Sequence, residues 1–200
     1  YTETQQVGTL PQEEKDAAFC IAGSLRISVN GPKGQTSLSA RPGETILISG
    51  GQEGDRSRML RRLFQLCTER LPAVPAALVP ADPVLFQTSI QDNICFGELF
   101  SQERLDQVME LTGLKQDFEK DRSEIERSAG KMGAAVSGGQ KKRIGIARAL
   151  YTCMSQCDFK NGVDGYLLFI DGLEEAVDEK TGELLISHVL NRPDAVTIVA

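Results

Sequence analysis

Residues 49–57, with the sequence SGGQEGDRS, follow a short apolar run and precede a segment with helical spacing. They approach the phosphate-loop pattern, in which glycine, four residues, glycine, lysine and serine or threonine bind a polyphosphate through backbone N–H groups. Gly50 and Ser57 match this pattern, but Asp55 stands at the second glycine and Arg56 at the lysine. The segment is therefore a nucleotide site, a degenerate one, or an acidic loop that binds nothing.

Carboxylates in this loop would repel a bound polyphosphate and weaken its binding. In an ungapped alignment Glu53 also stands at a glycine position, so two acids face the ligand. At about 4 Å, each like-charged pair costs about 4 kcal/mol at an effective dielectric near 20 and about 1 kcal/mol if it is well hydrated. The larger value is a large share of the roughly 8 kcal/mol of micromolar binding. If one residue is deleted from the alignment instead, only the later glycine is lost. Both alignments stay open, and the candidates for nucleotide contact are Gly50, Gly51, Gly54, Arg56, Ser57 and Arg58.

A second candidate site is the run VSGGQKKRIGIARALY at residues 136–151. Small residues let a backbone approach an anion closely, and the first N–H groups of a helix carry a partial positive charge. Ser137 adds a hydroxyl before the two glycines. We expect an anion-binding helix N-terminus formed by Ser137, Gly138, Gly139 and Gln140.

The elements that position these segments alternate between strands and helices. Strand-like runs at 24–29 and 36–40 flank the turn sequence NGPKG and suggest a small antiparallel layer. From Ser57 onward, apolar residues recur at helical spacing as far as Pro72. Buried strands are predicted at 76–79, 166–171 and 195–200.

The middle of the chain is predicted to be helical. Ser101 is a candidate N-cap and Gly113 a stop for one helix, and further helices are expected at 137–151 and 179–190. Strands that alternate with helices predict an α/β fold with a largely parallel sheet, and the helical block at 101–152 is an insertion into it.

Composition limits the class of protein. Two hundred residues, 40% hydrophobic and 25% charged, suit one globular domain or a core with an inserted subdomain. A net charge of −6 argues against a nucleic-acid partner. We expect a chain that is soluble as given, because no apolar stretch approaches the roughly 20 residues of a membrane span and no signal peptide is evident. Five scattered cysteines and one histidine predict neither a disulfide framework nor a metal cluster, and favour a reducing compartment.

Residues 136–151 resemble the signature motif of ATP-binding cassette (ABC) transporters and the helix that follows it. Residues 78–118 resemble the glutamine loop and the start of the helical subdomain of ABC exporters, most of all in the multidrug-resistance-associated and cystic-fibrosis-regulator subfamily. Residues 166–178, YLLFIDGLEEAVD, are similar to the Walker B strand and the loop after it. The resemblance covers about residues 20–200.

The resemblance implies a P-loop NTPase (RecA-like) core with a mixed sheet, a small antiparallel β layer and an inserted helical subdomain. The core would comprise about 19–85 and 152–200, the helical subdomain about 86–151, and a linker or arm residues 1–18. The family's switch histidine would follow the strand at 195–200, beyond the last residue given. His188 is instead expected to be a packed or half-exposed helix residue.

The resemblance also implies roles for single residues. In this family the signature binds the terminal phosphate of ATP held by the opposite domain of a head-to-tail dimer, so Ser137 to Gln140 would serve the partner's site. Asp171 matches the Mg²⁺-associated aspartate, and with Ser57 it is the candidate metal ligand. Asp178 matches the aspartate of the dimer-contact loop.

Two further positions depart from the family pattern. Gly172 stands where a glutamate positions the attacking water, and Ala81 stands where a glutamine-loop residue contacts Mg²⁺ and that water. Neither residue can accept a proton or orient a water through its side chain. Glu174 and Glu175 lie nearby, but the strand direction and their spacing make them unsuited substitutes.

The resemblance thus implies the first nucleotide-binding domain of a transporter. Its own ATP and Mg²⁺ binding would be weak or absent, hydrolysis there would be deficient, and its signature would complete a competent partner site that drives transmembrane transport. Expected partners are that second domain and transmembrane domains reached through coupling helices, at the cytoplasmic face of a membrane as part of an integral membrane protein. Two alternatives stay open: a catalytically inactive regulatory domain that senses nucleotide or a partner, and an active ATPase.

Overall fold

A computed structural model of the chain describes residues 17–21, 24–31, 34–118, 123–157, 165–173 and 179–200. The chain forms two compact units. The first comprises residues up to Leu78 together with 157–171 and 190–200, and the second comprises 79–156 and 172–189. Most of the predicted arm, residues 1–16, lies outside the described residues.

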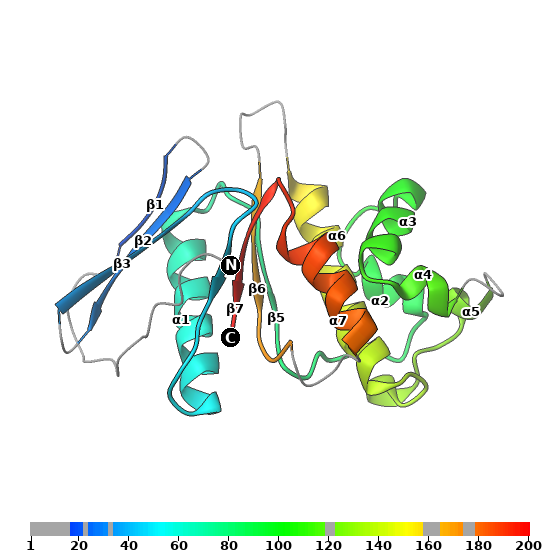
Figure 1. The fold of residues 1–200 in the computed structure, drawn as a ribbon. Helices are drawn as coiled ribbons and strands as arrows, with labels where there is room; N and C mark the ends of the chain where they lie inside the picture. The colour runs from blue at the N-terminus through cyan, green and yellow to red at the C-terminus, as the bar shows by residue number, and fades with distance from the viewer. Residues whose placement is uncertain (1–16, 22–23, 32–33, 119–122, 158–164, 174–178) are drawn as a thin grey trace. The chain divides into compact units, whose positions relative to one another are not determined.

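The first unit contains a three-stranded antiparallel sheet in the order β1-β2-β3 (Figure 1). Strands β2 (Ser24–Gly31) and β3 (Gly34–Ala40) confirm the predicted antiparallel layer. Strand β1 (Ala17–Ile21) pairs with β2, so strand structure begins two residues before the predicted start of the core. Its short sequence AAFCI lacks the apolar and polar alternation that distinguishes a half-buried strand.

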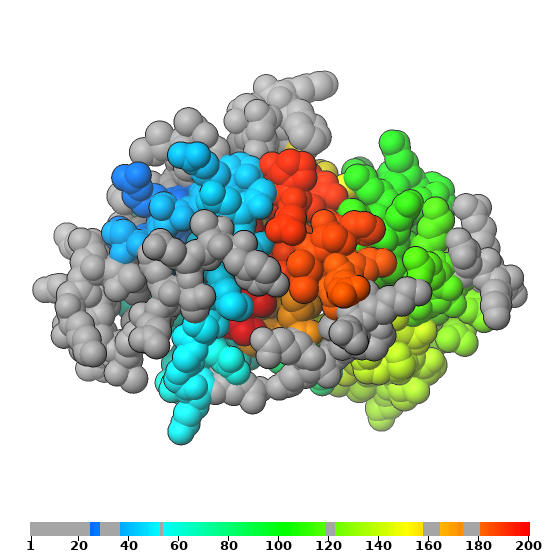
Figure 2. All heavy atoms as spheres, viewed as in Figure 1, coloured from blue at the N-terminus to red at the C-terminus, as the bar shows by residue number. Residues whose placement is uncertain are grey.

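A four-stranded sheet follows in the order β4-β7-β6-β5. Its strands are β4 (Thr45–Leu47), β5 (Ala76–Val79), β6 (Tyr166–Ile170) and β7 (Ala195–Val199). Strand β7 pairs in parallel with β4 and with β6. Every residue of β6 and β7 is buried, as expected of parallel strands, and little of β7 reaches the face shown in Figure 2. This sheet confirms the predicted α/β class.

Helix α1 (Glu53–Arg70) packs between the two sheets of the first unit (Figure 1). Its buried face includes Leu60 and Leu63, which join Ile27 of β2 and Phe169 of β6 in one apolar core. The rings of Phe64 and Phe169 meet edge to face, with centroids 5.4 Å apart. Each fully buried aliphatic or aromatic side chain contributes about 1.5–3 kcal/mol to folding, so this core fixes the helix that follows the glycine-rich loop.

The second unit is mainly helical. Its helices are α2 (Ile90–Ile94), α3 (Gln102–Leu111), α4 (Leu114–Asp117), α5 (Ser123–Glu126), α6 (Gly138–Gln156) and α7 (Glu179–Leu185). A 3-10 turn at Lys131–Gly133 precedes α6, and a π-helical turn at Ile186–Leu190 follows α7. Helices α2, α3 and α4 pack around α6 (Figure 1). None of the described helices is long and apolar enough to cross a membrane.

The predicted boundaries of α3 are confirmed. Ser101 is its N-cap, and the Ser101 hydroxyl accepts a hydrogen bond from the Arg104 N–H. The helix ends at Leu111, and Gly113 follows with a left-handed φ of +69° that favours glycine. The chain therefore turns directly from α3 into α4.

Candidate functional site

The glycine-rich loop is shorter than its sequence predicts. We expected the helix to begin near Ser57, but α1 begins at Glu53, with Gln52 as its N-cap. The N–H groups of Asp55 and Arg56 donate to the Gln52 carbonyl at 2.9 and 3.3 Å. Asp55 favours this early start because a carboxylate in the first turn complements the helix dipole. Two of the donors that a phosphate loop would offer are consequently engaged within the helix.

The glycines of the loop differ in their surroundings. Gly50 and Gly51 have left-handed φ values of +85° and +66°, whereas Gly54 lies within α1. A Cβ placed on Gly51 would lie 3.8 Å from Asp55 Oδ2, so this carboxylate lies beside the loop. Arg58 Nη1 lies 3.3 Å from Asp55 Oδ1, but both side chains are exposed, so this ion pair offsets the negative charge only modestly.

The candidate metal ligands are close together. The Ser57 hydroxyl donates to Asp171 Oδ1 at 2.7 Å, and Asp171, directly after β6, is 3% exposed. Both supply oxygen, the ligand type that Mg²⁺ requires, so the pair fits this ion. No group of three or more His, Cys, Asp or Glu among the described residues is placed to hold a metal, so phosphate and water would have to complete the coordination.

Two arginines of α1 bring positive charge to this part of the first unit. Arg61 Nη2 lies 3.6 Å from Asp171 Oδ2 and competes with a cation for that carboxylate. Arg56, at the position of the phosphate-loop lysine, is half-buried. Its Nε is buried without a hydrogen-bond partner among the residues that the structure describes.

Gly172 and Ala81, which replace the expected polar residues, lie next to each other in the second unit. A Cβ built on Gly172 would lie 3.2 Å from the Cβ of Ala81, tighter than ordinary van der Waals contact. The φ of Gly172 is +63°, a value that side-chain-bearing residues rarely adopt. The backbone at this position therefore suits glycine.

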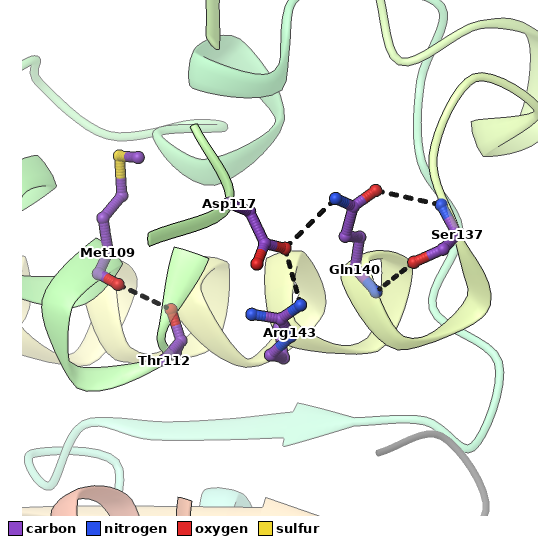
Figure 3. Close-up of polar contacts among 6 residues, drawn as sticks. All are labelled: Met109, Thr112, Asp117, Ser137, Gln140 and Arg143. Atoms are coloured by element: carbon purple, nitrogen blue, oxygen red, sulfur yellow. Dashed lines mark hydrogen bonds and ion pairs between the residues drawn. The ribbon is translucent and has the colours of Figure 1, made fainter. Parts of the chain in front are cut away.

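The signature residues form the capped end of α6. Ser137 Oγ accepts from the Gln140 N–H at 3.1 Å, and Gln140 Oε1 accepts from the Ser137 N–H at 3.0 Å (Figure 3). This reciprocal pair of hydrogen bonds is a capping box. Its serine-x-x-glutamine spacing is visible in the sequence, but from the sequence we predict only anion binding for these residues. Ser137 and Gly138 are exposed, and a Cβ on Gly138 would have no neighbour within 4 Å. The helix end is therefore open to a ligand.

The rest of α6 is held against the loop that contains Ala81. The buried Lys142 donates from Nζ to the carbonyls of Pro80 and Ala81, at 2.8 and 3.2 Å. A Cβ on Gly145 would lie 2.6 Å from Pro83 Cγ, so glycine is required for this close approach. These contacts give Lys142 and Gly145 structural roles in the signature helix, whereas anion binding at the helix end would explain neither residue.

An aromatic face lies on the same unit. Phe86 and Phe96 stack with centroids 4.7 Å apart, and the Arg148 guanidinium lies 5.7 and 5.8 Å from their ring centroids. Arg148 also donates to the Asn93 and Val84 carbonyls, and burial lowers its pKa from the usual value. Phe86 and Phe96 are nevertheless exposed, as are Leu99 and Phe100, which follow Phe96 within four residues of the chain; we refer to these four residues as the aromatic face.

The remaining predicted residues follow β6 along the chain. Asp178, Glu174 and Glu175 lie outside the described residues. His188 is exposed in the π-helical turn after α7, instead of packed or half-exposed as expected.

Comparison with known proteins places the chain in a family. No family model matches it. It is 31% identical over 179 residues to ABC transporter C family member 3 of Arabidopsis thaliana, covering 88% of this chain and 10% of that protein. It is 37% identical over 194 residues to multidrug resistance protein fer6 of Mycosarcoma maydis, covering 90% and 14% respectively. It is also 31% identical over 153 residues to ATP-binding cassette sub-family C member 4 of Mus musculus, and this match covers 74% of this chain and 11% of that protein.

The chain thus spans 10% to 14% of the length of these curated relatives. Among solved structures, its fold is similar to that of a bacterial Atm1-family ABC exporter with ATP bound, at a TM-score of 0.68 and 20% identity. That match covers 96% of this chain and 37% of the exporter chain, and it supports the fold. The sequence matches and the fold agree: the chain is a nucleotide-binding domain of the ABC transporter family, similar in sequence to members of its C subfamily.

Proposed function

We propose that this domain completes the ATP site of a second nucleotide-binding domain in a head-to-tail dimer, while its own site hosts little or no hydrolysis. The observation that carries the proposal is a contrast between two sites. The end of α6 is capped, exposed and lined by glycines, whereas Gly172 and Ala81 pack against each other where hydrolysis would need polar groups. Energy for transport would then come from the partner's site.

The signature supplies hydrogen-bond donors without a catalytic side chain. The first N–H groups of a helix have no carbonyl partner within it, and the Gln140 N–H is already capped by Ser137. The N–H groups of Gly138 and Gly139 and the Ser137 hydroxyl proton remain to bind the terminal phosphate of the partner's ATP. The positive end of the helix dipole adds to this attraction.

Three features support weak or absent nucleotide binding at the domain's own site. The early start of α1 engages the Asp55 and Arg56 N–H groups, and the Asp55 carboxylate lies beside Gly51. Arg61 contacts the aspartate that Mg²⁺ would need. Against this, Ser57 and Asp171 fit the metal, and together with the loop glycines, Arg56 and Arg58 they are the contacts that residual ATP would use.

The aromatic face fits transmembrane domains as partners. Isolated exposed apolar residues are ordinary, but grouped exposed aromatic rings mark an interaction surface. Coupling helices of a membrane domain would bury Phe86, Phe96, Leu99 and Phe100, placing this domain at the cytoplasmic face of a membrane. Asp178 would belong to the dimer contact, and nucleic acid is not a partner.

The proposal is tested with Ser137→Arg in the full-length transporter. A large cation at the helix end blocks both glycines, so we expect loss of at least about 99% of ATPase activity at the partner's site, the size of a lost transition-state donor. Ser39→Arg, an exposed serine on β3, is the matched control and should retain activity. Unchanged hydrolysis in Ser137→Arg would refute the proposal, and hydrolysis at this domain's own site after inactivation of the partner would favour the active-ATPase alternative.

A further inference from the structure

The carboxylate of Asp117, the last residue of α4, contacts two side chains of α6 at once. Its Oδ2 accepts from Gln140 Nε2 at 3.1 Å and from Arg143 Nη2 at 2.6 Å (Figure 3). Gln140 and Arg143 are three residues apart and therefore share a face of α6. Arg143 is only 8% exposed, so its charge needs a partner. Asp117 supplies that charge and reaches the signature through Gln140.

Asp117 also determines which way round the Gln140 amide lies. A carboxylate accepts hydrogen bonds and cannot donate them, so it selects the NH₂ end of the amide. The Oε1 atom is then left to accept from the Ser137 N–H, at 3.0 Å. With the amide reversed, its NH₂ would face the Ser137 N–H and both contacts would be lost. The capping box therefore depends on a carboxylate 23 residues earlier in the chain.

The corner between α3 and α4 brings Asp117 to this position. Thr112 donates from Oγ1 to the Val108 carbonyl at 2.7 Å and closes α3. Gly113 then turns the chain, and a Cβ there would lie 3.5 Å from Arg143 Nη1. Leu114, the first residue of the short helix, and Phe118, its C-cap, are 0% and 3% exposed. These buried anchors hold α4, so the carboxylate is placed by packing as well as by charge.

We infer that Asp117 is a positioning residue for the signature, acting through Gln140. The Gln140 amide is committed at both ends inside the domain, so Gln140 holds the helix end in place instead of binding the partner's phosphate. This inference rests on the proposed function and deepens it. The phosphate is left to the Ser137 hydroxyl and to the Gly138 and Gly139 N–H groups.

A polarity swap tests the inference in the full-length transporter. Gln140→Glu keeps an oxygen for the Ser137 N–H but turns a second oxygen toward Asp117, where two acceptors repel. We expect kcat/KM for ATP at the partner's site to fall about tenfold. Adding Asp117→Asn supplies an NH₂ group to the new carboxylate, which keeps a negative charge beside Arg143. We expect the double variant to recover to within about twofold of the wild type.

Control variants separate this inference from general stability and from the proposed function. Glu110→Gln makes the same acid-to-amide change as Asp117→Asn, at an exposed ion pair with Lys115 of α4, and should leave kcat/KM unchanged. Unfolding midpoints are recorded for every variant, and a change in kcat/KM that is not matched by a change in the unfolding midpoint is the result that a purely structural role would not give. If Ser137→Arg abolishes hydrolysis while Gln140→Glu does not reduce it, or Asp117→Asn does not rescue it, the role of Asp117 is refuted alone. If Ser137→Arg has no effect, the proposed function and this inference fall together.

Discussion

At the scale of single residues, Gly172 and Ala81 form a matched pair. Each is small where the family pattern has a polar side chain, and each leaves room for the other: a Cβ on Gly172 would lie 3.2 Å from that of Ala81. The left-handed φ of +63° adds a backbone cost for any other residue at position 172. A larger residue at position 172 would therefore meet both the contact with Ala81 and the backbone cost, so a single substitution there does not remove both obstacles.

We predict that Gly172→Glu does not restore hydrolysis at the domain's own site. The substitution places a side chain in a left-handed conformation against Ala81, which should destabilise the domain by about 1–2 kcal/mol. ATP turnover is measured in full-length transporter whose partner site has been inactivated, and stability by urea denaturation. Gly172→Ala is the control, since it carries the same backbone cost without a carboxylate. Turnover that appears in the glutamate variant and not in the alanine variant would contradict the prediction.

At the scale of elements, α6 is positioned by close contact with the loop at residues 80–83. Lys142 donates to the Pro80 and Ala81 carbonyls, and Gly145 lets Pro83 approach. The helix therefore carries the signature at one end and holds residues 80–83 along its side. A change in the packing of α6 should affect both regions.

Gly145→Ala is expected to destabilise the domain by about 1–3 kcal/mol, the usual cost of overpacking a core. The added methyl group would lie 2.6 Å from Pro83 Cγ, so either the helix or the loop must move. Gly138→Ala is the comparison on the same helix, because a Cβ there has no neighbour within 4 Å. Its unfolding free energy should stay within about 0.5 kcal/mol of the wild type. Equal stability of the two variants in urea titrations would show that the loop yields without cost.

The sequence predicted correctly those helices and strands that are specified by residues within the element itself. The strand at Ala76–Val79 and the cap at Ser101 came from apolar runs and a hydroxyl at a helix start, and both are confirmed. The predicted start of α1, Ser57, was wrong by four residues, because the helix begins at Glu53. The prediction followed the phosphate-loop pattern and gave too little weight to Asp55, which favours an earlier helix start. The contact between Asp117 and Gln140 could not be predicted because it depends on the corner at Gly113. Its partners are 23 residues apart, beyond the reach of any helical or strand spacing.

At the scale of the whole molecule, the aromatic face is the proposed docking surface for the transmembrane domains. Leu99 is 88% exposed and Phe100 is 55% exposed, although both are large and apolar. Leaving such side chains in water forgoes the free energy that burial would give. They are expected to be covered when the domain is part of a complete transporter.

We predict that Leu99→Ser weakens assembly with the transmembrane domains without destabilising this domain. Because the side chain is 88% exposed, it contributes little to the fold, and any free energy lost must come from contact with a partner. Burial of a leucine contributes about 1.5–3 kcal/mol, so the affinity for the membrane part should fall between about tenfold and about a hundredfold. Affinity is measured between separately purified domain and membrane parts, and domain stability by urea denaturation. Ile186→Ser removes an apolar side chain that is also exposed, outside the aromatic face, and should leave affinity unchanged. Equal affinity of the two variants would mean that the aromatic face is not the surface on which the membrane domains dock.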